Sequence, residues 1–161
     1  MPMSDTINAP ALSGWETYMA EALALAREAG AVGEIPVGCV VADEAGRIIG
    51  RGRNRREEGA DATAHAEIEA IREACRAKGA WRLEGCTLFV TLEPCPMCAG
   101  AILNARVSTV VYGAREAKSG SCGSVIDLFF ENYGFQPRVY EGVKREECAA
   151  LLRGFFRKMR E

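Results

Sequence analysis

Two short apolar runs with a helical segment between them most constrain the fold of this chain. The runs are CTLFVTL (86–92) and VSTVVYGA (107–114), and both are rich in β-branched residues. Continuous apolar runs of this length are typical of strands buried inside a sheet. The segment between them, PCPMCAGAILNAR, enters a helix at Pro96, where the missing N–H of proline is tolerated. We therefore expect an α/β fold with a layered sheet.

The segments before these runs continue the alternation of helices and strands. Residues 15–30 place their apolar side chains on one helical stripe, and Gly30 is a plausible helix end. Residues 37–53 contain an apolar run, the turn sequence DEAG and a second apolar run, which predicts an antiparallel β-hairpin. Residues 62–78 predict a second helix.

The last third of the chain predicts three further elements. Residues 123–130 are expected to form a short helix and residues 137–143 a short strand. Residues 144–160 predict a closing amphipathic helix. Its expected inner side consists of Leu151, Leu152, Phe155, Phe156 and Met159. No linker or internal repeat interrupts the chain, so we expect one domain over 1–161, with 1–14 as a loosely ordered polar lead-in.

Composition and charge exclude several classes of protein. Hydrophobic residues make up 48% of the chain and charged residues 26%, as in ordinary globular proteins. No apolar run approaches the roughly 20 residues that cross a bilayer, and no export signal is visible in the first ten residues. We therefore expect a cytoplasmic protein without membrane contact. The net charge of −2 does not by itself indicate a nucleic-acid binder, although a local basic face remains compatible with it.

The seven cysteines do not suggest a disulfide framework, because their number is odd and the expected compartment is reducing. Cys95 and Cys98 have C-x-x-C spacing at the start of a helix, where unsatisfied N–H groups favour thiolates. This spacing fits a shared metal ion or a redox pair. The cysteines expected to pack in the core are Cys39, Cys75, Cys86 and Cys148.

His65, the only histidine in the chain, favours the metal interpretation. If His65 opens the second helix as Cys95 and Cys98 open the third, the three side chains can converge above the ends of neighbouring strands. One imidazole and two thiolates leave a tetrahedral zinc ion with one open position, as in catalytic sites. We therefore expect one Zn²⁺ per subunit, bound by these three residues.

Glu67 lies two residues beyond His65 and is expected to stand beside the open position. A carboxylate there can take a proton from a water molecule whose pKa zinc lowers to about 7. Alone, Glu67 would be interpreted as a surface glutamate on the first turn of a helix. Together with the three ligands, it is predicted to be the catalytic residue.

The motifs HAE (65–67) and PCPMC (94–98) match the signature of zinc-dependent nucleobase deaminases. The likeness extends to EIPVGCVV, TAHAEIEAI, TLEPCPMCAGAI, VVYGAREAKSGSCGS and ECAALLRGFFR, in this order. From about Trp15 to Met159 the chain resembles the bacterial tRNA-specific adenosine deaminases of the cytidine and deoxycytidylate deaminase superfamily. The resemblance implies a homodimer with a three-layer α/β/α sandwich, cytidine-deaminase-like, around a mixed sheet of about five strands.

The resemblance also implies a reaction and further site residues. The reaction is hydrolytic deamination of adenosine to inosine at wobble position 34, in the anticodon stem-loop of an arginine tRNA. Asn54 matches the asparagine of the family that holds the target base. The other residues that we expect to bind the substrate are Pro36, Val37 and Ala66.

An anticodon loop suits such an enzyme because its bases are already unpaired. Basic side chains in the closing helix and in the GAREAKSG segment are candidates for contacts with the tRNA, although a solvated helix face would look the same. The candidate contact residues are Arg115, Glu116, Lys118, Arg153, Arg157 and Lys158. Two of the matched positions depart from the family pattern: Glu116 stands where many relatives carry aspartate, and Ala62 replaces a proline.

Three other functions fit part of this pattern. A deaminase of guanine, cytosine or a free nucleoside would share the zinc site. A non-catalytic zinc-stabilised RNA-binding module would need a fourth ligand, for which Cys122 in a Gly/Ser loop is the best candidate. A C-x-x-C oxidoreductase would require neither His65 nor Glu67.

Overall fold

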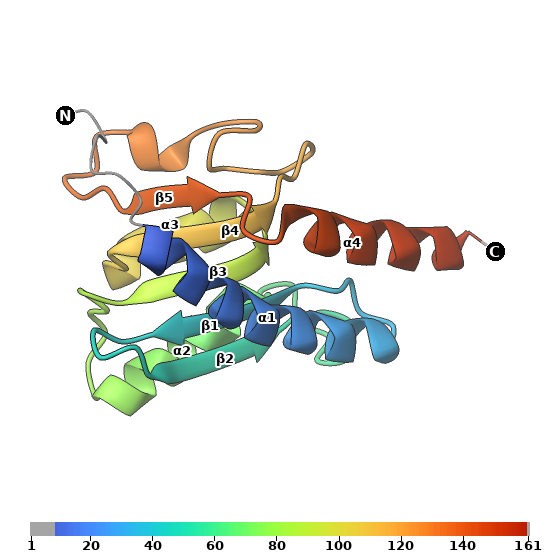
Figure 1. The fold of residues 1–161 in the computed structure, drawn as a ribbon, viewed down its shortest axis with the longest axis horizontal. Coiled ribbons are helices and arrows are strands. Elements are labelled where there is room, and N and C mark those ends of the chain that lie inside the picture. The colour runs from blue at the N-terminus through green and yellow to red at the C-terminus, as the bar shows by residue number, and fades with distance from the viewer. Residues whose placement is uncertain (1–8, 161) are drawn as a thin grey trace.

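The computed structural model describes residues 9–160 and shows a sheet between two layers of helices (Figure 1). The elements, in chain order, are α1 (Ala9–Ala31), β1 (Gly38–Ala42), β2 (Ile48–Arg53), α2 (Ala66–Lys78), β3 (Thr87–Leu92), α3 (Pro96–Ala105), β4 (Thr109–Ala114), the 3₁₀ turn η1 (Leu128–Phe130), β5 (Arg138–Glu141) and α4 (Arg145–Met159). None of the described helices has the length and apolar character needed to cross a membrane.

The sheet has the order β2-β1-β3-β4-β5 and is mixed. β1 runs antiparallel to both β2 and β3, whereas β3, β4 and β5 are parallel. This arrangement brings the carboxyl ends of β2, β3 and β4 and the start of β1 to one edge of the sheet. The segments that follow β2, β3 and β4 therefore meet at that edge.

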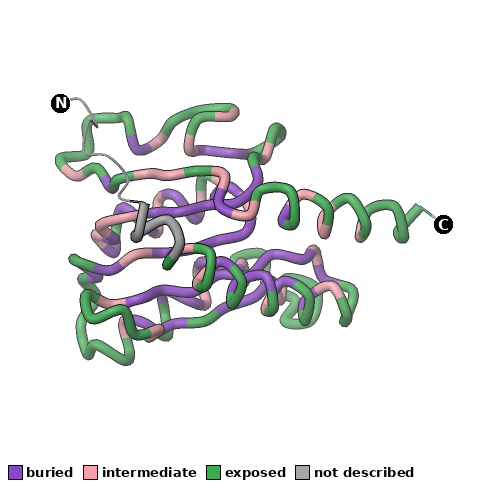
Figure 2. The backbone as a smooth tube through the Cα atoms, viewed as in Figure 1, coloured by how far each residue is buried: buried purple, intermediate pink, exposed green. Residues whose placement is uncertain are grey.

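Alternating side chains of the strands fill two cores. Cys39, Leu88 and Val110 belong to the core beneath α2 and α3. Val40 and Phe89 belong to the core beneath α1 and α4, on the opposite face. The tube coloured by burial shows that the central strands β1, β3 and β4 are mostly buried, whereas β5 has no buried residue (Figure 2).

A close approach of α2 to β2 requires glycine in the strand. A Cβ at Gly52 would lie 2.2 Å from the carbonyl oxygen of Ala66 and 2.7 Å from the backbone nitrogen of Ala70. Because glycine has no side chain, α2 can lie directly on the strand. The first turn of α2 is thereby held at the edge where β2 ends.

The expected mixed five-stranded sheet within an α/β/α sandwich is confirmed, and three elements differ most from their expected bounds. α1 begins at Ala9, inside the segment expected to be loosely ordered, since Pro10 is tolerated in a first helical turn. Residues 1–8 lie outside the described part. α2 begins at Ala66 rather than at residue 62, because Asp61 accepts hydrogen bonds from the backbone N–H and hydroxyl of Thr63 in a turn. The expected helix over 123–130 is only the short turn η1.

α4 is mostly exposed, and the prediction of its inner side is wrong for Phe156 and Met159. Leu151, Leu152 and Phe155 are partly buried, whereas the exposed fractions of Phe156 and Met159 are 44% and 67%. The reason is geometric, because α4 extends beyond the end of the sheet (Figures 1 and 2). Its last turns therefore have no strand beneath them.

Candidate active site

The side chains of His65, Cys95 and Cys98 converge at the edge of the sheet. His65 is the N-cap residue of α2, Cys95 is the N-cap residue of α3, and Cys98 lies in the first turn of α3. The Nδ1 atom of His65 lies 3.6 Å from the Sγ atom of Cys95 and 3.5 Å from the Sγ atom of Cys98. The predicted convergence of two helix starts is thus present.

The distances among these three atoms fit one tetrahedral zinc ion. Zinc lies about 2.3 Å from sulfur and about 2.0–2.1 Å from nitrogen, so tetrahedral angles place a sulfur and a nitrogen ligand about 3.6 Å apart. Within residues 9–160, this trio is the only group of three or more His, Cys, Asp or Glu side chains close enough to share an ion. One imidazole and two cysteine thiolates are also one of the donor sets that bind zinc in catalytic sites.

The two thiols are electrostatically coupled. A hydrogen bond from Cys98 lowers the pKa of Cys95 to about 4, and the same bond raises the pKa of Cys98. The hydrogen bond with Cys95 raises the pKa of His65. A dication in place of the shared proton would stabilise both sulfurs as thiolates.

Glu67 lies in the first turn of α2, and only 4% of its surface is exposed. Burial raises the pKa of Glu67 to about 7, and the nearby Cys95 adds to this shift. A carboxyl group with a pKa near neutrality can both accept and release a proton at physiological pH.

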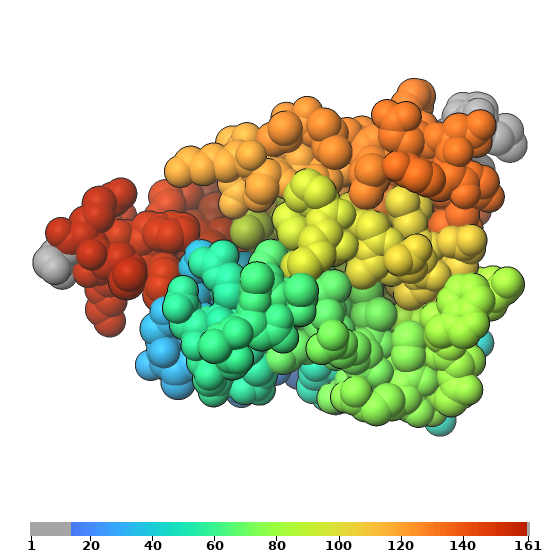
Figure 3. Space-filling model, turned by 180° about the vertical axis from the view of Figure 1, so that it is seen from behind, coloured from blue at the N-terminus to red at the C-terminus, as the bar shows by residue number. Residues whose placement is uncertain are grey.

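A cavity of about 170 Å³ connects these groups. Its lining residues come from several segments at the same edge of the sheet: Ile35, Val37, Asn54, Arg56, His65, Ala66, Glu67, Leu92, Glu93, Cys95, Glu116, Ser119, Leu152 and Phe156. In the space-filling view from behind, α4 stands out beside the green atoms of residues 50–65 (Figure 3). Because Leu152 and Phe156 belong to α4, the closing helix forms part of the cavity wall.

Three of the four predicted substrate-binding residues line this cavity, namely Asn54, Val37 and Ala66. The amide nitrogen of Asn54 donates to the carbonyl of Ile35 at 3.3 Å, and its oxygen accepts from the backbone N–H of Arg56 at 3.1 Å. These bonds fix the plane of the amide. Pro36 lies elsewhere and lines a larger groove of about 450 Å³ between α1 and α4.

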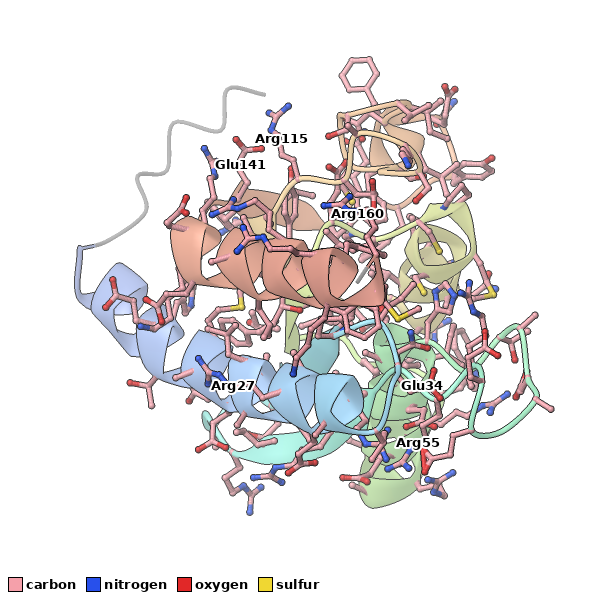
Figure 4. All side chains as sticks on the ribbon, turned by 90° about the vertical axis from the view of Figure 1, so that its right-hand side faces the viewer. Arg27, Glu34, Arg55, Arg115, Glu141 and Arg160 are labelled. Atoms are coloured by element: carbon pink, nitrogen blue, oxygen red, sulfur yellow. The ribbon has the colours of Figure 1, made fainter. Side chains whose placement is uncertain are left out.

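The predicted tRNA contacts occupy two regions. Glu116 lines the cavity, and Arg115 and Lys118 beside it are exposed. Arg115 forms an ion pair with Glu141 at 2.9 Å, and the two side chains lie together in Figure 4. The other candidates, Arg153, Arg157 and Lys158, are exposed on α4.

Two buried carboxylates escaped the sequence analysis: Glu93, which lines the cavity, and Glu34, which precedes the lining residue Ile35. Glu34 is 2% exposed and accepts hydrogen bonds from the backbone N–H groups of Glu57 and Glu58, beside Arg55 (Figure 4). Glu93 is also 2% exposed and accepts hydrogen bonds from the loop that follows β4. In the sequence, Glu34 and Glu93 lie within the segments EIPVG and TLEPC, and only the family resemblance of these segments drew attention to them.

Cys122, considered as a fourth ligand, does not belong to the group that could share an ion. Its backbone N–H donates to Glu93 at 3.0 Å, and burial raises the pKa of its thiol. Among the described residues, the group that could share an ion therefore has three members, His65, Cys95 and Cys98.

A model of the cytidine and deoxycytidylate deaminase zinc-binding region matches residues 13–114. The chain is 48% identical over 147 residues to the tRNA-specific adenosine deaminase of Bacillus subtilis (strain 168), and the match covers 91% of each chain. It is 50% identical over 146 residues to the tRNA(Ile)-lysidine synthase of Deinococcus deserti, where it covers 91% of this chain. The chain spans about a quarter of the length of that protein and of its Deinococcus radiodurans counterpart (27% and 24%).

Solved structures match over most of the chain. A structure from studies of A-to-I editing by tRNA:A34 deaminases at the wobble position of transfer RNA has a TM-score of 0.81 and 45% identity. The match covers 84% of this chain and 99% of that one. A guanine deaminase from Nitrosomonas europaea has a TM-score of 0.76 and 28% identity, covering 87% and 83% of the two chains.

Proposed function

The chain belongs to the cytidine and deoxycytidylate deaminase zinc-binding family, and from this premise we propose that it converts adenosine to inosine at wobble position 34 of tRNA. One observation carries the proposal: the donor atoms of three zinc-type ligands all lie within 4.8 Å of one another beside the buried Glu67, and Glu67 lines the same cavity as Asn54. The near-full-length match to a tRNA-specific adenosine deaminase supports adenosine in tRNA as the substrate.

We assign zinc binding to His65, Cys95 and Cys98. When bound, zinc supplies Lewis-acid activation of a water molecule at neutral pH. Glu67 accepts a proton from the attacking water and delivers it to N1 of adenine, and it then moves the proton of the new C6 hydroxyl to the departing amine. Water adds at C6, the C6–N bond breaks, and the products are inosine and ammonia.

The cavity walls orient the base. Asn54 has one amide hydrogen beyond its bond to Ile35, and this hydrogen can donate to an acceptor of the purine. Val37 and Ala66 supply apolar contact with the ring. The small cavity admits one base at a time, which requires the target nucleotide to leave its stack.

We further propose that the RNA substrate is the anticodon stem-loop of an arginine tRNA and that the enzyme acts as a homodimer in the cytoplasm. Bases in an anticodon loop are unpaired, so turning one outward costs less than opening a duplex. The exposed cations of α4 lie on the helix that borders the cavity and can contact phosphates around the loop.

Purified protein incubated with candidate substrates tests the proposal. The substrates are an arginine tRNA with A34, the same tRNA with G34, free adenosine, guanine and cytidine. Inosine is quantified by mass spectrometry of nuclease-digested RNA, and ammonia is measured in parallel. We expect inosine only with the A34 tRNA. Ammonia release from guanine or a free nucleoside, with no inosine in the tRNA, would assign the site to another deaminase reaction.

A further inference from the structure

We propose that Glu93 is a positioning residue that fixes the loop of residues 115–124 and thereby sets one wall of the substrate cavity. The kinetic part of this inference rests on the proposed function, whereas its structural part can be tested without any substrate.

Glu93 occupies the junction between the ligand segment and this loop. It directly follows β3 and lies two residues before Cys95. Its backbone N–H donates to the carbonyl of Ala114 at 2.8 Å, which keeps the neighbouring strands β3 and β4 paired to their ends. The loop begins at the next residue after β4, so the side chain of Glu93 lies where it can reach the whole loop.

The carboxylate of Glu93 accepts hydrogen bonds along the loop. Its Oε1 accepts from the backbone N–H of Glu116 at 3.1 Å and from the hydroxyl of Ser124. Its Oε2 accepts from the backbone N–H groups of Cys122 and Ser124 at 3.0 and 3.1 Å. Both ends of the loop are thus bound to one buried side chain, whose exposed fraction is 2%.

Gly120, at the middle of the loop, provides a second, independent observation. A Cβ at this position would lie 2.4 Å from the carboxyl carbon of Glu93 and 2.4 Å from the carbonyl oxygen of Glu116. The backbone of Gly120 therefore packs directly against the carboxylate, at a distance that allows no side chain. The loop is closed around Glu93 from its middle as well as from its ends.

The loop held by Glu93 supplies part of the cavity wall. Glu116 and Ser119 line the cavity together with the catalytic Glu67 and with Asn54. The position of Glu116 is set directly, because its own backbone N–H is bound to Glu93. Glu93 therefore determines how far this wall stands from the ligand segment 93–98 and hence how well a base fits.

The hydrogen-bond geometry makes glutamine a poor replacement for Glu93. A carboxylate offers two acceptor oxygens, whereas an amide offers one oxygen and one NH₂ group. With either orientation of the amide, its NH₂ group faces at least one backbone N–H, that of Glu116 or those of Cys122 and Ser124. Because two N–H groups cannot form a hydrogen bond with each other, that part of the loop loses its bond to residue 93.

The test compares wild-type protein with Glu93→Gln and Gly120→Ala. Hydrogen–deuterium exchange should be faster at the amides of 116–124 in both variants, whereas zinc content should stay at the wild-type value. The KM for A34 tRNA should rise roughly tenfold or more, with kcat nearly unchanged, because the wall binds the substrate rather than moving protons. If Glu93→Gln does not fold, Ser124→Ala removes a single donor and should give a smaller change of the same kind.

Asp43→Asn serves as the matched control. Asp43 also accepts two backbone N–H bonds, from Ala45 and Arg47, but in the hairpin turn at the other end of the sheet. It should change neither exchange at 116–124 nor KM. Loss of zinc from Glu93→Gln, a fall in kcat at constant KM, or unchanged loop exchange would each overturn the positioning role. Absence of tRNA deamination by the wild-type protein would contradict the proposed function, and the exchange measurement would still decide the role of Glu93.

Discussion

Single residues near the cavity show how surroundings decide the role of a carboxylate. Glu34 and Glu93 accept hydrogen bonds from backbone N–H groups of loops, which hold their oxygens in place. Glu67 is similarly buried, but its neighbours are the ligand side chains, and burial raises its pKa to about 7. Two of these carboxylates are therefore suited to anchoring loops, and the third is suited to carrying protons.

Replacement of Glu67 tests this division of roles. Glu67→Ala should bind zinc at the wild-type level, because none of the three ligands changes, and should lose roughly 10²–10⁴-fold in single-turnover rate. Metal analysis and a single-turnover assay on A34 tRNA measure the two quantities. Glu69→Ala, two residues along α2, removes a carboxylate that pairs with Arg55 and should keep near-normal turnover. Wild-type-like rates from Glu67→Ala would contradict its assignment.

The cysteines allow an equally direct comparison. Cys95→Ala should purify with substoichiometric zinc, because a site of three ligands loses one of them. Its midpoint of thermal unfolding should also fall, because Cys98 is then buried without the zinc ion that would neutralise its thiolate. Cys122→Ala should retain one zinc ion per chain, since Cys122 lies outside the ligand group. Zinc loss from Cys122→Ala would instead favour a closed four-ligand site and the non-catalytic function.

At the scale of elements, the site depends on the position of two helix starts relative to one sheet edge. α2 brings His65 and Glu67, and α3 brings Cys95 and Cys98. The position of α2 depends in turn on the glycines of β2, which let the helix backbone lie on the strand. Packing of backbone against backbone therefore sets the distance between the ligands of the two helices.

Gly52→Ala should disturb this packing. Its Cβ would lie 2.2 Å from the backbone oxygen of Ala66, so α2 or β2 must shift, at a cost of about 1–3 kcal/mol. The midpoint of thermal unfolding should fall by roughly 2–12 °C in a chain of this size. Gly100→Ala on α3 is the control, because nothing lies within 4 Å of its Cβ, and its midpoint should stay the same or rise slightly. An unchanged midpoint for Gly52→Ala would show that α2 is not held by this contact.

The elements that could be predicted from the sequence are those whose own residues determine them. The apolar strands β3 and β4 and the helix start at Pro96 are examples, because β-branched runs and an N-terminal proline have local effects. The inner side of α4 could not be predicted in this way. Phe156 follows the amphipathic pattern, yet it is exposed because the helix extends past the sheet, which depends on the relative lengths of two elements.

At the scale of the whole molecule, the candidate site is an assembly of segments that are distant in the sequence. The convergence of His65, Cys95 and Cys98 could be predicted because a C-x-x-C pair at one helix start, together with the only histidine at another, fits a shared zinc ion. Glu93 and Glu34 could not be distinguished from ordinary acidic residues, since their partners lie 23 to 31 residues away and are backbone N–H groups. Every residue except proline has a backbone N–H group, so no sequence pattern shows which of these groups bind a carboxylate.

The exposed end of α4 gives the molecule a charged surface next to its cavity. Leu152 and Phe156 border the cavity, while Arg157 and Lys158 on the following turn are exposed. A helix that is not covered by the sheet can approach a large substrate whose target base enters the cavity. Phosphates near that base would then lie within reach of these cations.

Charge reversal on this helix should therefore weaken tRNA binding. The double variant Arg157→Glu with Lys158→Glu should raise the Kd for tRNA and flatten the slope of log K against log salt by about 1 for each lost phosphate contact. Zinc content should stay unchanged, because α4 holds none of the ligands. Arg76→Glu with Arg82→Glu alters the same number of charges around the loop after α2, at the opposite end of β3, and should leave the slope near its wild-type value. Equal effects from the two double variants would mean that net charge, rather than the surface of α4, attracts the tRNA.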